Sequence, residues 1–545
     1  MKVWHLWQSL TALIMILIFE IIPAQTQIVS LPHLMKKGSA TQIVVQGKPF
    51  LILAGELGNS TPSDPKYLRP FWQNFKRMNL NTILSPVYWE LIEPAEGRFD
   101  FALVDSLIHS ARSYDLKLVL LWFGSWKNSM SCYAPSWVKR DQQRFPRART
   151  RSGQALEILT PFSEQNRKAD ARAFKALMQH IRSIDEQQQT VIMVQVENEI
   201  GMIPDARDYC DQANQFFSEP VPSDLMSYLQ KNKQFLIPEF RQIWEQMGYP
   251  TSGTWEQVFG KGLHTDEIFI AWHFARYADE VAKAGKEAYP LPMFVNAALI
   301  RPNYHPGQYP SGGPLPHLLE VWRAAAPHID FLAPDIYFKN FKEWCEKYDR
   351  SGNPLFIPEV ANTQSPTNAF YAIAQHNAMG YSPFSIESLR DPDSHPLTKA
   401  YDVLRQLEPL ILAKQGKGEM AGVLLDSTHH KAQVQLGDFI FNVRHEYSWP
   451  YAQKSEGEMP RFGGMIIMLE PDEFLIAGSG IVVTFEARSG NGAIAGIDRI
   501  DEGRFIGGIW SPGRRMNGDQ SHQGRHLHLP GTTYGIQRVK LYAYR

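Results

Sequence analysis

The stretch VIMVQVENEIG, residues 191–201, joins an apolar, β-branched run to a polar end. Residues 191–196 have the composition of a strand buried on both faces of a parallel sheet. Gln195, Glu197 and Glu199 share one strand parity, so polar side chains gather where the strand leaves the sheet. In a barrel of alternating strands and helices, active sites form on that face. The stretch therefore predicts a parallel sheet with a site at its carboxyl edge.

Similar apolar runs recur between about residues 45 and 390, with helical patterns between them. This alternation is typical of repeated βα units. Eight runs are present, at 50–54, 82–86, 117–123, 191–196, 293–297, 331–334, 355–358 and 381–386. Eight is the strand number of a (β/α)8 TIM barrel, which is the predicted α/β fold. An open doubly wound sheet is the alternative, but no Gly-rich dinucleotide turn follows any run.

The predicted helices present one apolar face each. After the first run, Asp64 and Pro65 form an N-cap and a first-turn proline. The apolar positions are Leu68, Phe71, Trp72, Phe75 and Met78, then Leu103, Leu107, Ile108 and Ala111, and later Phe174, Leu177, Met178 and Ile181. About ninety residues separate the fourth and fifth runs and include a helical stretch at 266–286. Excursions at this edge often build a substrate cleft.

After about residue 415 the pattern changes to strict alternation without a helical period, as in Ala432, Val434 and Leu436. The pattern predicts an all-β domain, with a sandwich favoured over a barrel. The predicted organisation is a signal peptide at 1–25, a barrel at 30–410 and a C-terminal β-sandwich at 415–545.

The N-terminus has the features of an export signal. Lys2 precedes an apolar run at 10–19 that is too short to span a bilayer comfortably. We expect a periplasmic or secreted protein, with an uncleaved membrane anchor as the alternative. Beyond residue 30 no second apolar segment is long enough to cross a membrane. No stable membrane insertion is therefore expected after signal removal.

Composition excludes several classes of partner. Lys and Arg number 55 against 56 Asp and Glu, so the net charge of −1 provides no basic surface for nucleic acid. The 3 cysteines form no CxxC pair, and no His cluster has zinc spacing. We expect no metal and no cofactor. The oligomeric state stays open.

A second carboxylate, Glu359, ends the seventh run, as Glu199 ends the fourth. Two carboxylates across a barrel mouth are what glycosidic bond cleavage requires. A separation of about 5–5.5 Å favours a retaining mechanism, whereas about 6.5–9.5 Å leaves room for an inverting water. The sequence leaves this distance open.

Asn198-Glu199 together with Glu359 resembles the large clan of retaining (β/α)8 glycosidases. Within it the chain most resembles glycoside hydrolase family 35, the β-galactosidases, through Ala-Gly-Glu-Leu at 54–57, Tyr-Trp-Glu-Leu-Ile-Glu-Pro at 88–94, and residues 195–201. Gly58 stands where that family has His, and Glu90 and Ile92 replace its Asn and His.

The resemblance implies that Glu199 is the acid/base and Glu359 the nucleophile. It implies release of terminal β-D-galactosyl residues from carbohydrates, with xyloglucan side chains as one expected substrate. Glu199 must begin protonated, so we expect burial and the charge of Glu359 to raise its pKa.

Further contacts follow from other strand ends. Tyr337 is expected to hydrogen-bond Glu359, with ordinary packing as the alternative, and Asn198 to hold a sugar hydroxyl. Trp126 is a candidate sugar platform or a core residue. The other expected sugar contacts are Lys127, Asn128, Glu56, Tyr88, Asn296 and Glu387. The parity of Glu197 predicts a buried group facing the barrel interior.

Three alternative functions remain. The first is another retaining glycosidase, such as a family 42-like galactosidase, a mannanase or an arabinosidase. The second is a non-catalytic carbohydrate-binding barrel, which predicts missing carboxylates. The third is a metal-dependent barrel hydrolase, but the first strand has no His-x-His ligand pair.

Overall fold

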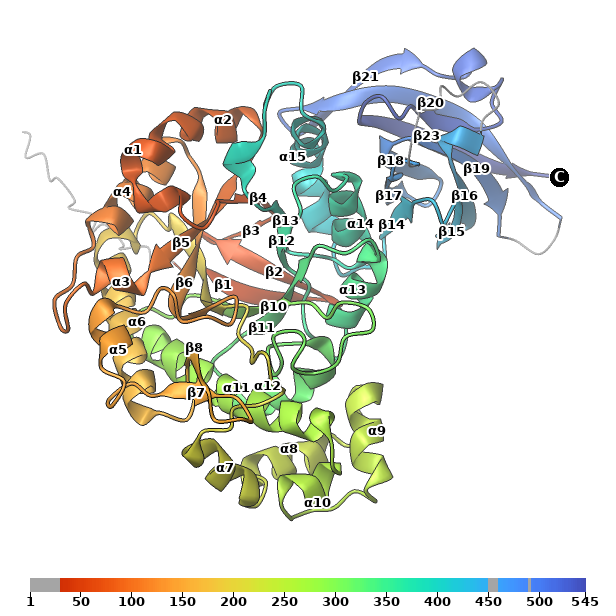
Figure 1. Cartoon of the computed structure of the whole chain (residues 1–545). Coiled ribbons are helices and arrows are strands. Elements are labelled where there is room, and N and C mark those ends of the chain that lie inside the picture. Colours follow the sequence, from red (N-terminus) through yellow and green to blue (C-terminus); the bar gives the residue numbers. More distant parts are fainter. Residues whose placement is uncertain (1–29, 449–458, 489–491) are drawn as a thin grey trace, which may run out of the picture.

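The computed structural model describes residues 30–448, 459–488 and 492–545. Its largest part is a closed eight-stranded barrel whose strands follow chain order, from β4 around to β13 (Figure 1). Each strand overlaps one predicted run, so the barrel is confirmed and the open sheet is excluded. The barrel strands are β4 (Ile52–Glu56), β5 (Thr82–Tyr88), β6 (Lys117–Lys127), β9 (Val191–Asn198), β10 (Met293–Ala298), β11 (Phe331–Ile336), β12 (Ile357–Val360) and β13 (Gly380–Pro383).

Helices cover the outside of the barrel (Figure 1). The carboxylate of Asp64 accepts the Lys66 amide at 2.8 Å, which is the predicted N-cap. Pro70 lacks an N–H, and the predicted first helix is split there into two. The helices are α1 (Pro65–Leu68), α2 (Trp72–Arg77), α3 (Trp89–Ile92), α4 (Ala102–Ser113), α5 (Ser136–Arg140), α6 (Glu164–Asp185), α11 (Leu263–Ala288), α12 (Leu319–Ala325), α13 (Phe341–Tyr348), α14 (Thr367–Gln375) and α15 (Pro396–Lys414). A small hairpin, β7 (Arg147–Arg149) and β8 (Ala155–Leu159), lies between α5 and α6.

A three-stranded antiparallel sheet closes the bottom of the barrel. It consists of β1 (His33–Lys37), β2 (Ala40–Val45) and β3 (Lys48–Phe50), which the sequence analysis did not predict. Ile43 and Val45 belong to the same apolar cluster as Phe294 and Phe331 at the starts of their strands. The interior is thus sealed at this end, which leaves the opposite end as the open mouth.

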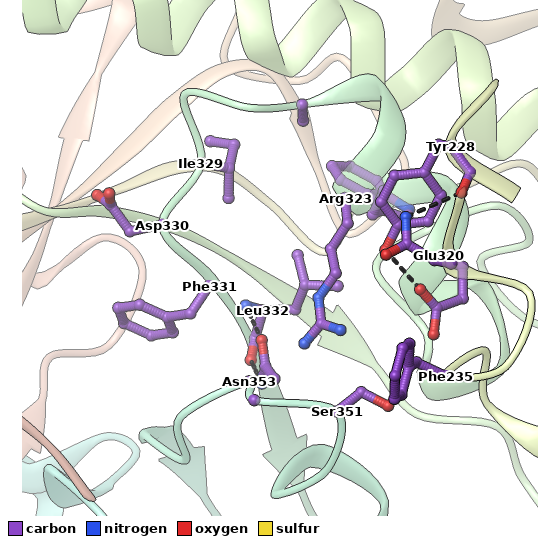
Figure 2. Close-up of a pocket in the computed structure, with 14 residues that line it drawn as sticks. Tyr228, Phe235, Glu320, Arg323, Ile329, Asp330, Phe331, Leu332, Ser351 and Asn353 are labelled. Carbon is purple, nitrogen blue, oxygen red and sulfur yellow. Dashed lines mark hydrogen bonds between the residues drawn. The ribbon is translucent and has the colours of Figure 1, made fainter. Parts of the chain in front are cut away.

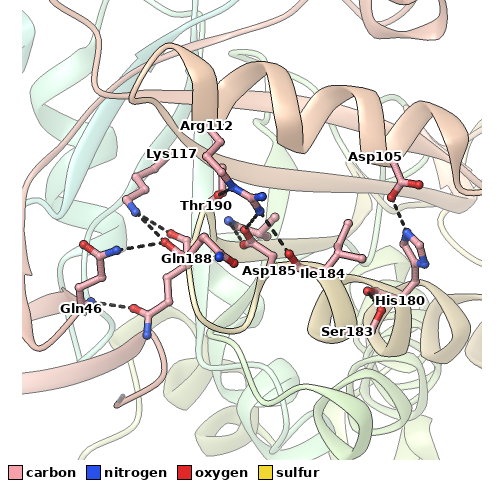
Figure 3. Close-up of polar contacts among 12 residues, drawn as sticks. Gln46, Asp105, Arg112, Lys117, His180, Ser183, Ile184, Asp185, Gln188 and Thr190 are labelled. Atoms are coloured by element: carbon pink, nitrogen blue, oxygen red, sulfur yellow. Dashed lines mark hydrogen bonds and ion pairs between the residues drawn. The ribbon is translucent and has the colours of Figure 1, made fainter. Parts of the chain in front are cut away.

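Polar contacts hold the start of β9 in place (Figure 3). The Asp185 carboxylate accepts hydrogen bonds from the Arg112 guanidinium and from the Val191 amide, both at 2.7 Å. The Gln46 amide donates to the Gln188 carbonyl at 3.1 Å. Strand β9 leads to Glu199, so these contacts at its start help to fix the position of Glu199 in the barrel mouth.

The long excursion between β9 and β10 forms α7 (Asp211–Ser218), α8 (Ser223–Asn232), α9 (Pro238–Gln246) and α10 (Trp255–Phe259). Helix α8 contacts α12, and α10 contacts α11, so these helices thicken the outer layer (Figure 1). Near the strand end, the Met202 amide donates to the Ser311 carbonyl at 2.8 Å. A contribution of this excursion to the substrate cleft stays a prediction.

The C-terminal region is all-β, as predicted. One sheet has the order β14-β17-β18-β23-β20-β21 and the other β15-β16-β19-β22. Phe441 of one sheet and Phe474 of the other share an apolar cluster, with ring centroids 4.9 Å apart, which confirms a sandwich. The strands are β14 (Met420–Leu425), β15 (Lys431–Leu436), β16 (Phe439–His445), β17 (Phe462–Glu470), β18 (Glu473–Ser479), β19 (Ile481–Ala487), β20 (Ile494–Ile506), β21 (Ile509–Arg515), β22 (Leu527–Leu529) and β23 (Gly535–Tyr544).

The sandwich packs directly on the barrel helices. Helix α14 contacts β14 and β17, and Met465, Ile467 and Leu475 belong to the main apolar cluster of the barrel. A Cβ on Gly422 would lie 2.7 Å from the Tyr371 carbonyl, so only glycine allows this close approach. The shared core fixes the β-domain against the barrel.

The predicted signal peptide lies outside the described residues. Within the described ranges, no helix combines the length and apolarity needed to cross a membrane. Cys132, Cys210 and Cys345 are free thiols.

Candidate active site

Strand alternation brings acidic side chains into the barrel mouth. Ile52 in β4 faces the interior, and Glu56 shares its parity at the strand end. In β11, Phe331 faces the interior, and Asp335 lies on the same side of the strand. Both carboxyl groups are buried. The apolar interior therefore ends in an acidic layer at the mouth.

Glu359 reaches this layer from β12, with its Cα paired to that of Asp335. The predicted contact with Tyr337 is present, because the Tyr337 hydroxyl donates to Glu359 Oε1. Glu359 Oε2 is buried and has no hydrogen-bond partner among the described residues. Tyr337 is 42% exposed, whereas Glu359 is buried. One carboxylate oxygen is therefore held while the other stays available.

Glu199 follows β9 with a left-handed backbone, at a φ of 45°. Its amide donates to Asn296 Oδ1 at 3.1 Å, and its carboxylate accepts from Asn128 Nδ2. The carboxyl group of Asp335 also hydrogen-bonds to it. These contacts come from three other strands or their ends, so the barrel as a whole sets the orientation of Glu199.

A tight turn presents Asn128 to Glu199. Lys127 and Met130 exchange backbone hydrogen bonds of 2.8 and 3.0 Å, and both central residues have positive φ, 49° at Asn128 and 68° at Ser129. Asn tolerates this conformation better than most residues. Asn128 Nδ2 thus donates a hydrogen bond to the Glu199 carboxylate. A sugar contact through its remaining amide atoms stays a prediction.

Burial dominates the electrostatics of the site. It raises the pKa of Glu199, as expected. The expected effect of the Glu359 charge on Glu199 runs in the opposite direction, because burial and the negative charge of Glu199 raise the pKa of Glu359 to about 7. Lys127 is buried beside them and acts to lower both pKa values. Burial and the charge of Glu359 hold the pKa values of Glu56 and Asp335 well above normal. The cluster therefore retains protons near neutral pH.

Asn198 is buried next to Glu199, yet neither Oδ1 nor Nδ2 has a hydrogen-bond partner among the described residues. A buried amide without partners costs about 1–3 kcal/mol. Such groups are rare and call for a functional explanation. Asn198 therefore offers one donor and one acceptor for a bound hydroxyl.

Trp126 is not a sugar platform. Its side chain is 0% exposed, and its indole N–H donates to the Leu159 carbonyl at 3.1 Å. The ring packs against Tyr277 and Phe274, at centroid distances of 4.5 and 5.1 Å. Because it fills the space between β6 and α11, the core alternative holds and the binding prediction is wrong.

Tyr88 also makes contacts within the fold. Its hydroxyl donates to the Asn59 carbonyl at 2.6 Å, and its ring contacts Tyr133 at 5.2 Å. The side chain is buried. The predicted sugar contact is therefore not supported, and Tyr88 instead holds the loop after β4.

Glu197 does not face the barrel interior. Its φ of 60° reverses the alternation, and its carboxyl group lies against Asp170 of α6 in the outer layer. Glu197 Oε2 accepts the Trp126 amide at 2.8 Å. A Cβ on Gly124 would lie 2.6 Å from Glu197 Oε1, so glycine is required there. The parity argument failed because it holds only for extended backbone.

The sequence analysis missed Asp335 and Asp170 as site residues. A signal for Asp335 was its parity with Phe331 and Ala333. Asp170 lies on the apolar face of α6 with Phe174, one turn away, and it is fully buried. A carboxylate inside an apolar helical stripe was the signal for a specific partner.

The structure explains why position 58 is Gly and not the His of family 35. Glu387 Oε1 accepts from the Gly58 amide at 3.0 Å and from the Thr61 hydroxyl at 2.6 Å. A Cβ at Gly58 would lie 2.6 Å from that oxygen. Glu387 thus occupies the space that a larger residue at position 58 would need.

Within the described part of the chain, no group of three His, Cys, Asp or Glu side chains is arranged to hold a metal ion. The site contains paired carboxyl groups, Glu199 and Glu359, beside the buried ammonium of Lys127.

A separate cavity of about 610 Å³ lies near the starts of β11 and β12, away from the carboxylates. Figure 2 shows Arg323 beside it and the Tyr228 hydroxyl directed at Glu320, to which it donates at 2.6 Å. Because strand starts face away from the mouth, this cavity is not part of the carboxylate site.

Comparison with known families supports a glycosidase domain. Residues 66–302 match the sequence model of glycoside hydrolase family 42, described as β-galactosidase. Residues 397–528 match a domain of unknown function. The chain is 27% identical over 185 residues to a β-galactosidase of Xanthomonas manihotis. The aligned segment covers 31% of this chain and 27% of that relative. It therefore spans about a quarter of that relative's length.

Solved structures with similar folds include the cold-adapted β-galactosidase from Rahnella sp. R3, at 15% identity and a TM-score of 0.45 over 66% of this chain and 57% of that one. Another is the β-galactosidase from the psychrophilic Marinomonas ef1, at 11% identity and a TM-score of 0.46 over 68% and 63%. The predicted resemblance to family 35 is not supported. The match to the family 42 β-galactosidase model runs from α1 to just after β10, so it includes Glu199 and ends before Glu359.

Proposed function

We propose that this protein is a retaining β-galactosidase that releases terminal β-D-galactosyl residues by double displacement. The observation that carries the proposal is the pair of buried carboxyl groups, Glu199 and Glu359, at one barrel mouth. The charge of Glu199 raises the pKa of Glu359, so the two carboxyl groups interact across the mouth. We propose retention because Glu359 Oε2 has no hydrogen-bond partner among the described residues and is free to act as a nucleophile.

In the first step, Glu359 Oε2 attacks the anomeric carbon while Glu199 gives its proton to the leaving oxygen. The bond to the leaving group breaks with its electron pair on that oxygen, and a covalent galactosyl ester forms. Tyr337 holds Glu359 Oε1, so the unpartnered Oε2 is the atom free to react.

In the second step, Glu199 takes a proton from water as the water oxygen attacks the same carbon. The ester bond breaks, galactose leaves with retained configuration, and both carboxyl groups return to their starting states. Esterification removes the negative charge of Glu359, which lowers the pKa of Glu199 and suits it to act as a base.

Asn198 and Lys127 are proposed to hold the sugar. The unpartnered amide of Asn198 suits the hydroxyl next to the reacting carbon, a contact that can strengthen in the transition state. Lys127 supplies positive charge beside the carboxylates. We also propose export to the periplasm or medium, on the N-terminal sequence alone.

The test is hydrolysis of p-nitrophenyl β-D-galactoside by wild type, Glu199→Ala and Glu359→Ala, with azide as an external nucleophile. We expect each variant to lose about 10²–10⁴-fold or more in kcat. Azide should restore Glu199→Ala through β-galactosyl azide and Glu359→Ala through α-galactosyl azide. Full activity in either variant would overturn the assigned pair.

A panel of other chromogenic glycosides separates the remaining candidates. Turnover of a mannoside or arabinoside in place of the galactoside would keep the mechanism and replace the sugar. Binding of galactose without turnover of any glycoside would favour the carbohydrate-binding alternative.

A further inference from the structure

A large cleft lies between the barrel mouth and the C-terminal sandwich. It measures about 1020 Å³ and begins at Tyr337, the residue that hydrogen-bonds Glu359. One wall is formed by the segments after β11 and β12, at 338–343 and 361–366. The other wall comes from the sandwich, at 426–429, 461–462 and 531–534. The cleft thus follows the joint between the two domains and reaches the barrel mouth at Tyr337.

Several contacts keep the two walls at a constant distance. The Arg461 guanidinium donates to the Lys339 carbonyl, and the Ser365 hydroxyl donates to the Arg461 carbonyl at 3.2 Å. The hydroxyls of Thr367 and Tyr534 lie 3.0 Å apart. The rings of Tyr534 and Phe370 stack, with centroids 5.5 Å apart and planes at 7°. The cleft is therefore a preformed feature of the fold.

The walls carry groups that recognise neutral polyols. Thr532 and Thr533 are exposed hydroxyl side chains on the sandwich wall. Thr428 is also exposed there, but its hydroxyl donates to Asp426 at 2.7 Å. On the barrel wall Asn362 offers an amide and Tyr337 offers an exposed ring, whereas the Gln364 amide is bonded to Ile336 and Asn368 within the fold. Hydroxyls and amides exchange hydrogen bonds with sugar hydroxyls, and aromatic faces cover their C–H surfaces.

The cleft is larger than one sugar requires. Pockets that enclose a drug-sized ligand measure about 300–1,000 Å³, and this cleft lies at the upper end of that range without counting the barrel mouth itself. Because the galactosyl unit would occupy the mouth, the cleft lies on the path of whatever is attached to it.

We propose that this cleft binds the leaving-group sugars of an oligosaccharide, with the C-terminal sandwich as one wall of the binding site. The proposal rests on the proposed galactosidase function and extends it. The sandwich would then determine which galactosides are hydrolysed well, although it contributes no catalytic carboxylate.

The test compares a short and a long leaving group in wild type and two variants. Thr533→Trp fills the cleft from the sandwich wall. Ile509→Trp is the matched control, since Ile509 is 75% exposed in the same domain and does not line the cleft. The probes are p-nitrophenyl β-D-galactoside, lactose, and β-galactosyl-terminated oligosaccharides of three to five sugars in two linkage series.

We expect the wild-type kcat/KM to rise at least tenfold from lactose to the longer oligosaccharides. Thr533→Trp should reverse that rise and change kcat/KM for the p-nitrophenyl galactoside by less than about threefold. Ile509→Trp should change neither. Activity without any length dependence, or an equal loss on both probes in Thr533→Trp, would overturn the cleft proposal alone. If the wild-type enzyme hydrolysed none of the galactosides, the proposed function would be overturned, and the cleft proposal with it.

Discussion

The carboxyl groups of Glu197 and Asp170 share one hydrogen bond in a fully buried site between β9 and α6. Asp170 also accepts from the Trp122 indole at 2.8 Å and from the amide and hydroxyl of Ser125, at 3.1 and 2.6 Å. Asp170 is thus the carboxylate, and burial beside it raises the pKa of Glu197 well above normal. Glu197 therefore holds the proton. The pair also links the ends of β9 and β6, because Glu197 accepts from the Trp126 amide and Asp170 accepts from Ser125.

Glu197→Gln should therefore be close to wild type. The glutamine amide can donate to Asp170 as the protonated carboxyl does, and its carbonyl can accept the Trp126 amide. We expect kcat/KM within about threefold of wild type and little change in Tm. Glu197→Ala leaves buried groups without partners, at about 1–3 kcal/mol each, and should lower both stability and activity. Equal damage in the two variants, in thermal unfolding and kinetics, would show that the proton is not on Glu197.

Asp335 should tolerate Asn in the same way. Its Oδ2 accepts the Asn296 amide at 2.6 Å, and its protonated oxygen donates to Glu199. Asn reproduces both contacts, so Asp335→Asn should keep most activity. Asp335→Ala removes a hydrogen bond to a charged group, worth about 1.5–3 kcal/mol, or about 10- to 150-fold in rate.

The pH profile separates positioning from simple packing at Asp335. Its hydrogen bond lowers the pKa of Glu199, so loss of the bond in Asp335→Ala should move the alkaline limb of kcat/KM to higher pH. Asp335→Asn should leave the limb unchanged. An unshifted profile in the alanine variant would assign Asp335 a structural role only.

Tyr337→Phe should move the acidic limb of the kcat/KM profile to higher pH. The Tyr337 hydroxyl lowers the pKa of Glu359, which stands at about 7 in the intact site. Without that hydrogen bond Glu359 ionises at higher pH, so the variant should lose more activity at pH 6 than at pH 8. Tyr67→Phe, at a 58% exposed tyrosine on α1, is the control. An equal loss of kcat/KM at both pH values would show that Tyr337 does not influence the ionisation of Glu359.

Glu359→Gln should stabilise the protein at high pH. Burial raises the pKa of Glu359 from 4.5 to about 7, so its stabilising contribution is complete below pH 4.5 and is lost as pH rises through 7. Gln cannot ionise and avoids that loss. The variant should show a higher Tm than wild type at pH 8, and the difference should shrink at pH 5. Glu219→Gln, at an exposed position, should show no such trend.

Local pattern was enough to predict the barrel and the two carboxylates. Each strand is an apolar run of its own, and Glu199 and Glu359 immediately follow such runs, so their meeting at one mouth follows from parallel strands. The all-β tail was predictable for the same reason, because two-residue alternation is visible in any short segment.

Side-chain direction at the strand ends was less predictable. Glu197 and Glu199 have positive φ, and Trp126 turns into the outer layer of helices. Alternation predicts direction only while the backbone stays extended, and a single left-handed residue reverses it. The three strands that close the barrel bottom were missed because they are short and lie outside the repeating βα pattern.

The sequence by itself determined the fold class, the order of the eight barrel strands and the identity of the two carboxylates at the mouth. Only the tertiary structure decided which side chains surround them: Asp335 and Asn128 at Glu199, Tyr337 at Glu359, and Asp170 behind Glu197. It also decided that the sandwich forms one wall of the cleft. The physical reason is that strand formation depends on neighbouring residues, whereas hydrogen bonds between distant segments depend on barrel closure and domain packing.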